Sequence, residues 1–468
     1  MSENNNQLTN LNRRDFLKKS TGLALAGAGT VMFAGSAHAS KKDTDWKNHG
    51  HSDDKLWKEV RKEFVLDKKS VYMNVGTTGS MPEAVLKQYT KNNNIVATSP
   101  WDMQNKFGSW PYTTEMVESI ASGFGANDSE IVISRNTTDG MCSIIHGMHF
   151  EEGDVILTTH HEHVGADSPF DVISKRNGVE IVHLEIPVYT GSEDISAQDF
   201  VDVFAKGIEE HKGRVRLIVF SHITYKTGTK LPAKEICELA VANKIPTLID
   251  GAHTVGMLNL DFHDIDCDFY AGSGHKWQCG PGSTGLLYVR DDCSRLKEYW
   301  SDCDVPLWFV NSSLAHADYL GSQWQLQYKG NDNFPALQGF TDSCKMWDQI
   351  GRDKIEQRVL DLSALCKDLL EDNNAFPFGQ LYAPNQRELS SGISSFNPFQ
   401  NQQDLPTLNN FRDRLREEYG YIIRSTDFKV KIDDQDETHA LRISTHLFHN
   451  EDDVFGLVEA MQDLYQKM

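Results

Sequence analysis

Between about residue 130 and residue 290, short apolar runs alternate with longer segments of helical periodicity. Seven such runs are present, at 131–134, 155–158, 181–186, 217–220, 246–249, 268–271 and 285–289. Continuous apolar runs separated by helices are typical of parallel strands, because these strands are buried on both faces of the sheet. The pattern predicts an α/β fold with a seven-stranded, mostly parallel sheet and flanking helices.

The rest of the chain is organised around this segment. Residues 40–70 are charged and predict a linker that leads into a helix near 55–64. The large domain is expected over residues 71–335. A helical pattern up to residue 370 and a mixed pattern beyond it predict a smaller C-terminal α+β domain over residues 336–468, which ends on a helix.

Residues 1–39 have the features of an export signal. Arg13 and Arg14 precede Phe16-Leu17-Lys18, and a mild apolar run of 21–35 leads to a small-residue cleavage site at 37–39. The paired arginines resemble the twin-arginine signal of bacteria, and the run is too short to span a bilayer stably. We expect recognition by the twin-arginine export machinery, a periplasmic mature chain and no stable membrane insertion. A membrane anchor or a plain N-terminal helix is the alternative.

Charge and cysteine content exclude several classes of partner and fold. The chain has 46 Lys and Arg against 67 Asp and Glu, a net charge of −21. An acidic surface repels phosphate backbones and anionic lipids, so we expect no nucleic-acid partner. The eight cysteines form no C-x-x-C pair. They are expected to be buried apolar side chains, with one or two disulfide bridges as an open alternative.

Polar residues follow five of the apolar runs, where the strands are expected to end. These segments are 136–140, 160–163, 221–222, 250–253 and 273–276. Because ligands of parallel sheets bind at the carboxyl ends of the strands, we expect the five segments to meet at one site.

Lys276 and Asp250 stand at two of these strand ends. Lys276 follows Ser273-Gly274-His275, and its enclosure would lower the pKa of its amine and make it nucleophilic, as Schiff-base chemistry requires. A buried Asp250 needs a partner, and a protonated pyridine nitrogen would suit it. His253 could touch the same ring. The alternatives are a solvated loop lysine and a helix N-cap.

The segment from Asn136 to Gly140 lies between a strand and an apolar helical pattern. A helix N-terminus with hydroxyl side chains binds phosphate well, and a plain N-cap is compatible with this role. Ser273 and His275 could add further contacts. The chain lacks the G-x-x-x-x-G-K-[ST] and G-x-G-x-x-G loops, so P-loop and dinucleotide sites have little support.

The segment 160–163 reads His-His-Glu-His, and such a cluster of potential ligands could indicate a zinc site. Consecutive residues at a strand end point to different sides, and no second pair of ligands follows at metal spacing. We therefore expect no metal site. A single histidine stacked on an aromatic cofactor ring is the better interpretation.

With Asp250-x-x-His253 followed by Ser273-Gly274-His275-Lys276, the sequence resembles the class V aminotransferase family of fold-type I pyridoxal 5′-phosphate (PLP) enzymes. The resemblance extends from about Tyr72 to the C-terminus. The family includes cysteine desulfurases, selenocysteine lyases, kynureninase-like enzymes and isopenicillin N epimerase, and the epimerase-like members are the most similar. The resemblance implies a homodimer and an amino-acid substrate.

The resemblance also implies roles for individual residues. Lys276 would bind PLP and later move the α-proton, Asp250 would pair with the pyridine nitrogen, and His163 would stack on the ring. Arg442, in Leu441-Arg442-Ile443-Ser444, would bind the substrate α-carboxylate, with a surface salt bridge as the alternative. The phosphate would be held by Thr137, Thr138, Ser273 and His275.

Three further positions follow from the resemblance, two of them as departures from it. Tyr225 stands where desulfurases have an asparagine that faces the phenolic oxygen of the ring, and it can donate the same hydrogen bond. Asn331 replaces a threonine in a loop that, in this family, reaches the phosphate of the neighbouring subunit. Asn74 lies in the segment 72–80, which resembles the family's loop over the active site, although a plain turn is equally compatible.

The expected reaction is therefore at the Cα of an amino acid, as in epimerisation. Persulfide-forming desulfurase activity is not expected, because the stretch 421–442 contains no cysteine. Inversion requires a second acid, for which Tyr225 and His222 are the candidates. Transamination or β-elimination from a sulfur or selenium amino acid would use the same residues. An inactive binding protein on the same scaffold is the non-enzymatic alternative.

Overall fold

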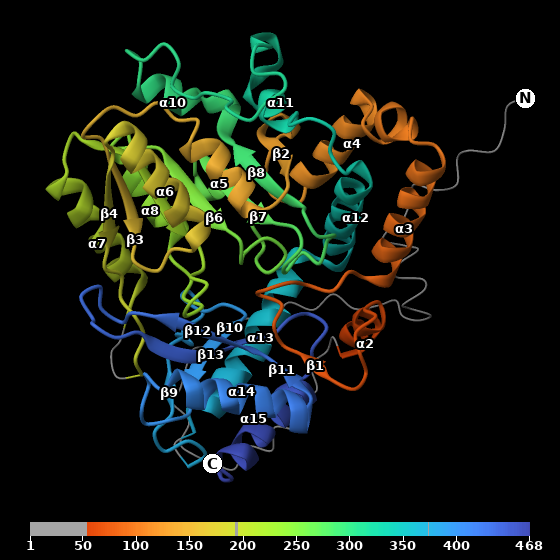
Figure 1. Cartoon of the computed structure of the whole chain (residues 1–468), viewed down its shortest axis with the longest axis vertical. Coiled ribbons are helices and arrows are strands. Elements are labelled where there is room, and N and C mark those ends of the chain that lie inside the picture. Colours follow the sequence, from red (N-terminus) through yellow and green to blue (C-terminus); the bar gives the residue numbers. More distant parts are fainter. Residues whose placement is uncertain (1–53, 192–194, 373) are drawn as a thin grey trace, which may run out of the picture.

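The computed structural model describes residues 54–191, 195–372 and 374–468. Figure 1 shows a large domain built around one sheet, with a smaller sheet domain below it that carries the C-terminus. The predicted export signal lies outside the described residues.

The large domain contains a seven-stranded sheet with the order β2-β8-β7-β6-β5-β3-β4. Its strands are β2 (Ile131–Ser134), β3 (Val155–Thr159), β4 (Glu180–Leu184), β5 (Val215–Ser221), β6 (Thr247–Gly251), β7 (Phe269–Ser273) and β8 (Gly285–Val289). Neighbours from β4 to β7 pair in parallel, and β8 is antiparallel to both β2 and β7. The predicted seven-stranded, mostly parallel sheet is confirmed.

The two faces of this sheet belong to two separate apolar cores. In β5, Leu217 and Val219 belong to one buried cluster, whereas Ile218 and Phe220 belong to the other. Side chains alternate between the faces of a strand, so a strand covered on both sides is apolar at every position. This is why the seven runs could be recognised as strands.

Helices flank the sheet on both faces (Figure 1). The helical elements of the large domain are α3 (Glu83–Thr98), η2 (Met103–Phe107), α4 (Trp110–Ala121), η3 (Asp128–Glu130), α5 (Thr137–Ile145), α6 (Val164–Asn177), α7 (Ala197–Glu210), α8 (Ala233–Ala242), α9 (Phe262–Ile265), η4 (Arg290–Cys293), α10 (Ser294–Tyr299), η5 (Asp318–Leu320), α11 (Gly321–Gln327) and α12 (Phe334–Ile350).

The smaller domain is an antiparallel sheet of order β12-β13-β10-β9 with helices packed on it. Its elements are α13 (Arg352–Leu370), β9 (Gln380–Leu381), β10 (Ile393–Asn397), α14 (Leu405–Tyr419), β11 (Tyr421–Ile422), β12 (Arg424–Phe428), β13 (Thr438–Ser444) and α15 (Glu451–Tyr465). Helix α2 (Asp54–Lys62) forms where a helix was predicted, and β1 (Val71–Tyr72) pairs in parallel with β11. The start of the described chain therefore joins the small domain.

Helix α12 begins beside the domain division that we placed after Pro335. It packs against α3 and α4 of the large domain, whereas the next helix, α13, packs against α15 and β10 of the small domain. Gly351, with a φ of 104°, lies between α12 and α13. The division at residue 335 stays a prediction.

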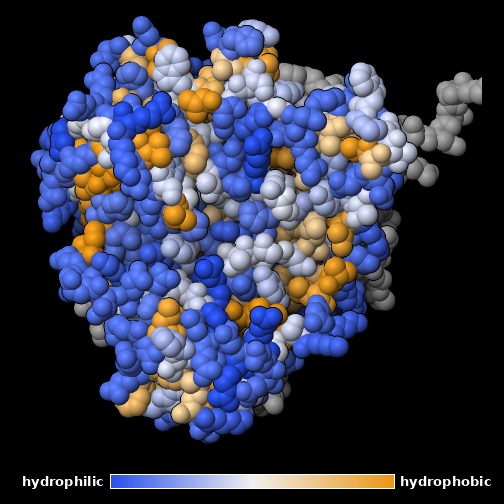
Figure 2. Space-filling model, in the orientation of Figure 1, coloured by the Kyte–Doolittle hydropathy of each residue, from blue (hydrophilic) through white to orange (hydrophobic). Residues whose placement is uncertain are grey.

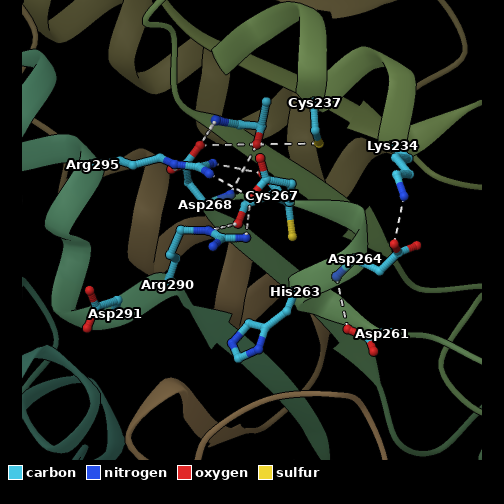
Figure 3. A network of polar contacts seen from close by, with 12 residues as sticks. Lys234, Cys237, Asp261, His263, Asp264, Cys267, Asp268, Arg290, Asp291 and Arg295 are labelled. Carbon is cyan, nitrogen blue, oxygen red and sulfur yellow. Dashed lines mark hydrogen bonds and ion pairs between the residues drawn. The ribbon is translucent and has the colours of Figure 1, made fainter. Parts of the chain in front are cut away.

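A polar network fixes the starts of the two central strands that carry Asp250 and Ser273 at their other ends (Figure 3). The Asp268 carboxylate accepts hydrogen bonds from the backbone amide of Thr247 at 2.9 Å and from its hydroxyl at 3.3 Å. Arg295 lies 3.7 Å from the same carboxylate and pairs with Asp266 at 2.6 Å. Since Thr247 begins β6 and Asp268 precedes β7, the network fixes the register of these strands.

The face of the molecule in Figure 2 is mostly hydrophilic, with scattered apolar patches. Within the described residues, no helix is both long and apolar enough to cross a bilayer. All eight cysteines lie in the described residues and are free, and six are buried. Burial of the cysteines agrees with the sequence interpretation, but the one or two disulfide bridges left open there are not formed.

Candidate active site

A cavity of about 340 Å³ lies at the carboxyl ends of β3, β6 and β7, where β12 and β13 of the small domain also contribute side chains. Four of the five polar segments predicted to meet contribute to its wall. The fifth, 221–222, does not, although Tyr225 from the same connection does. Every residue predicted to bind cofactor or substrate lines the cavity except Asn74 and Asn331, and His222, a candidate for the second acid, does not line it.

Lys276 and Asp250 meet in this cavity from neighbouring strand ends. Burial lowers the pKa of Lys276 to about 8. The positive charges of Arg442 and Arg424 act in the same direction, and the negative charge of Asp250 opposes them. In the described part of the chain, Nζ of Lys276 has no hydrogen-bond or ion-pair partner. A substantial fraction of this amine is therefore neutral near physiological pH, as a nucleophile must be.

Asp250 is the last but one residue of β6 and is 5% exposed. Its Oδ1 atom accepts a 2.8 Å hydrogen bond from the amide of Ala252, and no described residue donates to Oδ2. Burial raises the pKa of Asp250, and the Ala252 amide and the charges of Lys276 and His163 oppose this. A cationic donor that reaches Oδ2 would satisfy this carboxylate.

The N-terminus of α5 and the end of β7 form the predicted anion site. Asn136 caps α5 by accepting a 2.9 Å hydrogen bond from the amide of Asp139. The hydroxyl oxygens of Thr137 and Ser273 lie 2.7 Å apart and line the cavity, as do Thr138 and His275. Free backbone amides and hydroxyl groups at a helix N-terminus form a binding site for an anion.

Two histidines of the cavity are held as neutral rings. His163 caps α6, and its Nδ1 accepts a 3.0 Å hydrogen bond from the amide of Gly165. His253 Nδ1 accepts from the indole of Trp277 at 3.2 Å. Burial lowers the pKa of both histidines, so each ring is uncharged with its proton on Nε2.

Arg442 reaches the cavity from β13 and is 1% exposed. Its Nη1 donates to the carbonyl oxygen of Tyr225 at 3.2 Å, its Nη2 donates to the hydroxyl of Thr77 at 3.1 Å, and its buried Nε has no partner among the described residues. Burial and the charge of Arg424 lower the pKa of Arg442 to about 9. A surface salt bridge is therefore the wrong alternative for this residue.

The two predicted residues outside the cavity have local partners. Asn74 accepts a 2.9 Å hydrogen bond from the hydroxyl of Thr77, so it positions a lining residue rather than lining the cavity itself. Asn331 is exposed and accepts a hydrogen bond from Gln104. Its expected contact with a neighbouring subunit stays a prediction.

The segment 160–163 sends its side chains to separate places. His160 Nδ1 accepts from the amide of Ile186 at 3.3 Å, and His161 Nε2 donates to the carbonyl of Lys429 at 2.8 Å. Glu162 accepts from the hydroxyl of Ser221 at 2.6 Å and is fully enclosed, which raises its pKa to about 7. Of these residues, only His163 lines the cavity.

Sequence reasoning missed Arg424 and Thr77, which also line the cavity. Arg424 lies on β12 directly opposite Arg442 on β13. No sequence signal marks this pairing, because the register of β12 against β13 is set by the tertiary structure. Thr77 lies within the segment 72–80, which resembles the family's loop over the active site, but the resemblance points to Asn74 and not to Thr77.

Comparison with known proteins agrees with this geometry. The family model described as aminotransferase class-V matches residues 71–455. Isopenicillin N epimerase of Streptomyces clavuligerus is 26% identical over 416 residues, covering 87% of this chain and 98% of that protein. Cysteine desulfurase of Pectobacterium carotovorum subsp. carotovorum is 28% identical over 303 residues, covering 64% and 68%.

A solved structure of a C-DES variant, with glycine covalently linked to the PLP cofactor, has the same fold. It matches with a TM-score of 0.66 at 22% identity, covering 86% of this chain and 99% of that one. The seven-stranded sheet, its flanking helices and the smaller sheet domain are thus those of fold-type I PLP enzymes.

The residues of the cavity fit this cofactor. The partnerless amine of Lys276 suits the aldehyde, the unpaired Oδ2 of Asp250 suits a protonated pyridine nitrogen, and the hydroxyl-lined start of α5 suits the phosphate. His163 and Tyr225 would lie beside the ring. Because the family model matches most of the chain, residues 71–455, the chain belongs to the class-V aminotransferase family of PLP-dependent enzymes.

Proposed function

We propose that this enzyme acts at the Cα of an amino acid and inverts its configuration, as an isopenicillin N epimerase-like protein. The observation that carries the proposal is the convergence of Asp250, Lys276 and Arg442 on one buried cavity. The similarity to isopenicillin N epimerase over almost the whole length of that protein supports it.

PLP, when bound, supplies an electron sink for the pair of electrons left by a broken Cα bond. The protein residues do the rest. Asp250 keeps the pyridine nitrogen protonated through its free Oδ2. Arg442 binds the substrate α-carboxylate through its guanidinium group. Lys276 Nζ accepts the α-proton, which its lowered pKa permits near neutral pH.

Inversion requires a proton on the opposite face of Cα. Of the two candidates from the sequence, Tyr225 lines the cavity and His222 does not. His222 is bound through Nδ1 to the hydroxyl of Tyr270 at 2.9 Å, and burial lowers its pKa to about 3. Burial raises the pKa of Tyr225 to about 12, so its hydroxyl carries a proton at neutral pH. We assign the second proton transfer to Tyr225.

The absence of a suitable thiol argues against persulfide formation. No cysteine lines the cavity in the described part of the chain. Cys366 is buried in α13, where burial raises the pKa of its thiol to about 12. A lyase reaction by β-elimination needs no such thiol, and the similarity to a cysteine desulfurase keeps it as the second candidate.

The test uses the holoenzyme in deuterated water with single amino acids. Deuterium at Cα together with inversion supports the epimerase. A keto acid indicates transamination, and pyruvate or alanine with released sulfur or selenium indicates a lyase. If the PLP-loaded protein exchanges the Cα hydrogen of no amino acid, then the epimerase, transaminase and lyase assignments are all wrong. That result would favour an inactive binding protein.

Lys276→Ala and its control Lys354→Ala, at an exposed position of α13, separate chemistry from folding. Lys276→Ala is expected to remain folded but to lose the visible absorbance of the attached cofactor and all Cα exchange. Lys354→Ala is expected to retain both.

We further propose that the protein is exported to the periplasm by the twin-arginine route and functions as a homodimer. The Arg13-Arg14 signal supports the first proposal. The 76% exposure of Trp101 and the exposure of Asn331 support the second. Fractionation of cells that express the Arg13→Lys, Arg14→Lys variant tests the route, and sedimentation equilibrium of the mature protein tests the dimer.

A further inference from the structure

Two arginines face each other across neighbouring strands in the wall of the cavity. Arg424 of β12 and Arg442 of β13 are direct partners in the antiparallel register, so their side chains leave the same face of the sheet. Like charges at directly opposed positions destabilise a sheet. An arrangement of this kind is favoured when an anion binds between or beside the two groups.

Protein groups do not supply that anion. Within the described residues, neither guanidinium forms an ion pair with a carboxylate. Both instead approach the hydroxyl of Thr77, Arg442 at 3.1 Å and Arg424 at 3.5 Å. The neutral hydroxyl cannot compensate two positive charges. Burial lowers the pKa of both Arg442 and Lys276, and the nearby charge of Arg424 lowers each of them further.

The cavity is cationic inside an acidic protein. Its described wall carries Lys276, Arg424 and Arg442 against a single carboxylate, that of Asp250, whereas the whole chain has a net charge of −21. A cleft of opposite sign to its surroundings concentrates anionic ligands and excludes cationic ones. The substrate side chain is therefore expected to be neutral or negative, and not basic.

The proposed function accounts for two of the anions but not for Arg424. The phosphate is placed at the start of α5 and the end of β7, by Thr137 and Ser273. The α-carboxylate is placed at Arg442. Arg424 remains as a planar, exposed guanidinium in the wall. Its Nε donates to the carbonyl oxygen of Ser425 at 3.2 Å, which leaves the edge formed by Nη1 and Nη2 to match a carboxylate.

We propose that Arg424 binds a second carboxylate of the substrate, so that the enzyme prefers amino acids with an acidic side chain over neutral ones. This proposal rests on the proposed function, because it takes Arg442 as the site of the α-carboxylate. The competing explanation is that Arg424 only holds the loop at Thr77. The 3.5 Å separation makes that contact weak, and a loop role would affect all substrates equally.

The kinetic test compares amino acids of equal chain length with and without the second carboxylate. The pairs are 2-aminoadipate against norleucine and glutamate against norvaline, each followed by Cα exchange in deuterated water. The wild-type holoenzyme is expected to show a tenfold or greater preference in kcat/KM for the acidic member, carried mainly by KM. Arg424→Gln is expected to abolish that preference, and Arg424→Lys to restore part of it.

Arg416→Gln, at an exposed position of α14, removes one positive charge from the same domain and is expected to keep the preference. Equal kcat/KM for both members of each pair in the wild type would overturn the proposal. An equal loss for both members in Arg424→Gln would also overturn it, because that result indicates a role in loop structure alone.

A binding test without turnover separates this proposal from the proposed function. Adipate and hexanoate have the same chain length, and neither has an amino group. Adipate is expected to raise the Tm of the wild-type holoenzyme more than hexanoate does, and Arg424→Gln is expected to remove the difference. If no amino acid exchanges its Cα hydrogen but adipate still raises the Tm more than hexanoate does, only the proposed function is wrong. If amino acids exchange their Cα hydrogen but adipate and hexanoate raise the Tm equally, only the second carboxylate site is wrong.

Discussion

The backbone amide of Gly79 donates a 2.8 Å hydrogen bond to the carbonyl oxygen of His275, the residue before Lys276. The same N-terminal segment is held by the small domain, because the amide of Ser444 donates to the carbonyl of Met73 at 2.8 Å. Residues 73–79 therefore connect β13 of the small domain with the turn that carries the reactive amine.

The close approach at Gly79 predicts that a methyl group is not tolerated there. In Gly79→Ala the added Cβ would lie 2.0 Å from the carbonyl oxygen of Lys276, so the loop or the lysine turn must move. Such overpacking costs about 1–3 kcal/mol in the free energy of unfolding. We expect a lower midpoint in urea unfolding and weaker PLP retention.

Gly282→Ala is the control, because a Cβ at Gly282 meets nothing within 4 Å. It is expected to behave as the wild type. Equal stability and cofactor retention in both variants would contradict the close contact between the loop and Lys276.

The pairing of Thr137 and Ser273 predicts a selective loss of phosphate affinity. Ser273→Ala removes a hydroxyl that lies 2.7 Å from that of Thr137 at the start of α5. One hydrogen bond to a charged group contributes about 1.5–3 kcal/mol, so the Kd for PLP is expected to rise about tenfold or more. Absorbance titration of the apoprotein measures it.

Pyridoxal, which lacks the phosphate, provides the internal control for this variant. Its affinity should change little in Ser273→Ala. If PLP and pyridoxal lose affinity to the same extent, Ser273 acts on the ring or on folding and the phosphate assignment is wrong.

The pKa of about 8 for Lys276 predicts the pH dependence of cofactor capture. Only the neutral amine attacks an aldehyde, so the rate of PLP binding to the apoprotein should rise with pH through about 8 and then level off. Arg424→Gln removes a nearby positive charge and should shift the midpoint to higher pH. Asp250→Asn removes the negative charge and should shift it to lower pH.

Stopped-flow absorbance over pH 6 to 10 measures these midpoints (roughly two units on either side of the lysine pKa). Arg416→Gln should leave the midpoint where the wild type has it. Shifts of Arg424→Gln and Asp250→Asn in the same direction would rule out direct electrostatic control of Lys276.

Lys367 predicts a pH dependence of stability that is separate from the active site. It is fully buried in α13, where it donates to the Ser390 hydroxyl at 2.7 Å and to the Pro384 carbonyl at 3.0 Å. Burial lowers its pKa to about 7. In the unfolded chain the pKa of a lysine is about 10.4. Between these values the unfolded state binds the extra proton, so the free energy of unfolding should rise with pH.

Urea unfolding at pH 7, 8 and 9 should show this slope, which for one proton is about 1.4 kcal/mol per pH unit at most. Lys367→Met should reduce the slope, and Lys354→Met, at an exposed position of the same helix, should not. An unchanged slope in Lys367→Met would show that the buried amine stays protonated through its hydrogen bonds.

Much of the large domain could be predicted because its strands are marked by short, local patterns of apolar residues. The run 131–134 and the run 285–289 match β2 and β8 residue for residue, since strands buried on both faces are apolar throughout. Because ligands bind at the ends of parallel strands, the same pattern also predicts that Asp250, Lys276 and Thr137 share one site. The division of the domains was harder, because a helix such as α12 has the same pattern whichever domain it packs against.

Short segments of the chain indicate which residues can carry the chemistry, because a lysine and an acid at the ends of apolar runs and a hydroxyl-rich helix start are local features. The three-dimensional fold is needed to place Arg424 opposite Arg442, to bring Thr77 rather than Asn74 into the cavity wall and to hold His222 against Tyr270 outside it. The Thr77 loop meets Arg442 across 365 positions of the chain. That contact and the register of β12 against β13 depend on packing of the whole chain, which no local pattern records.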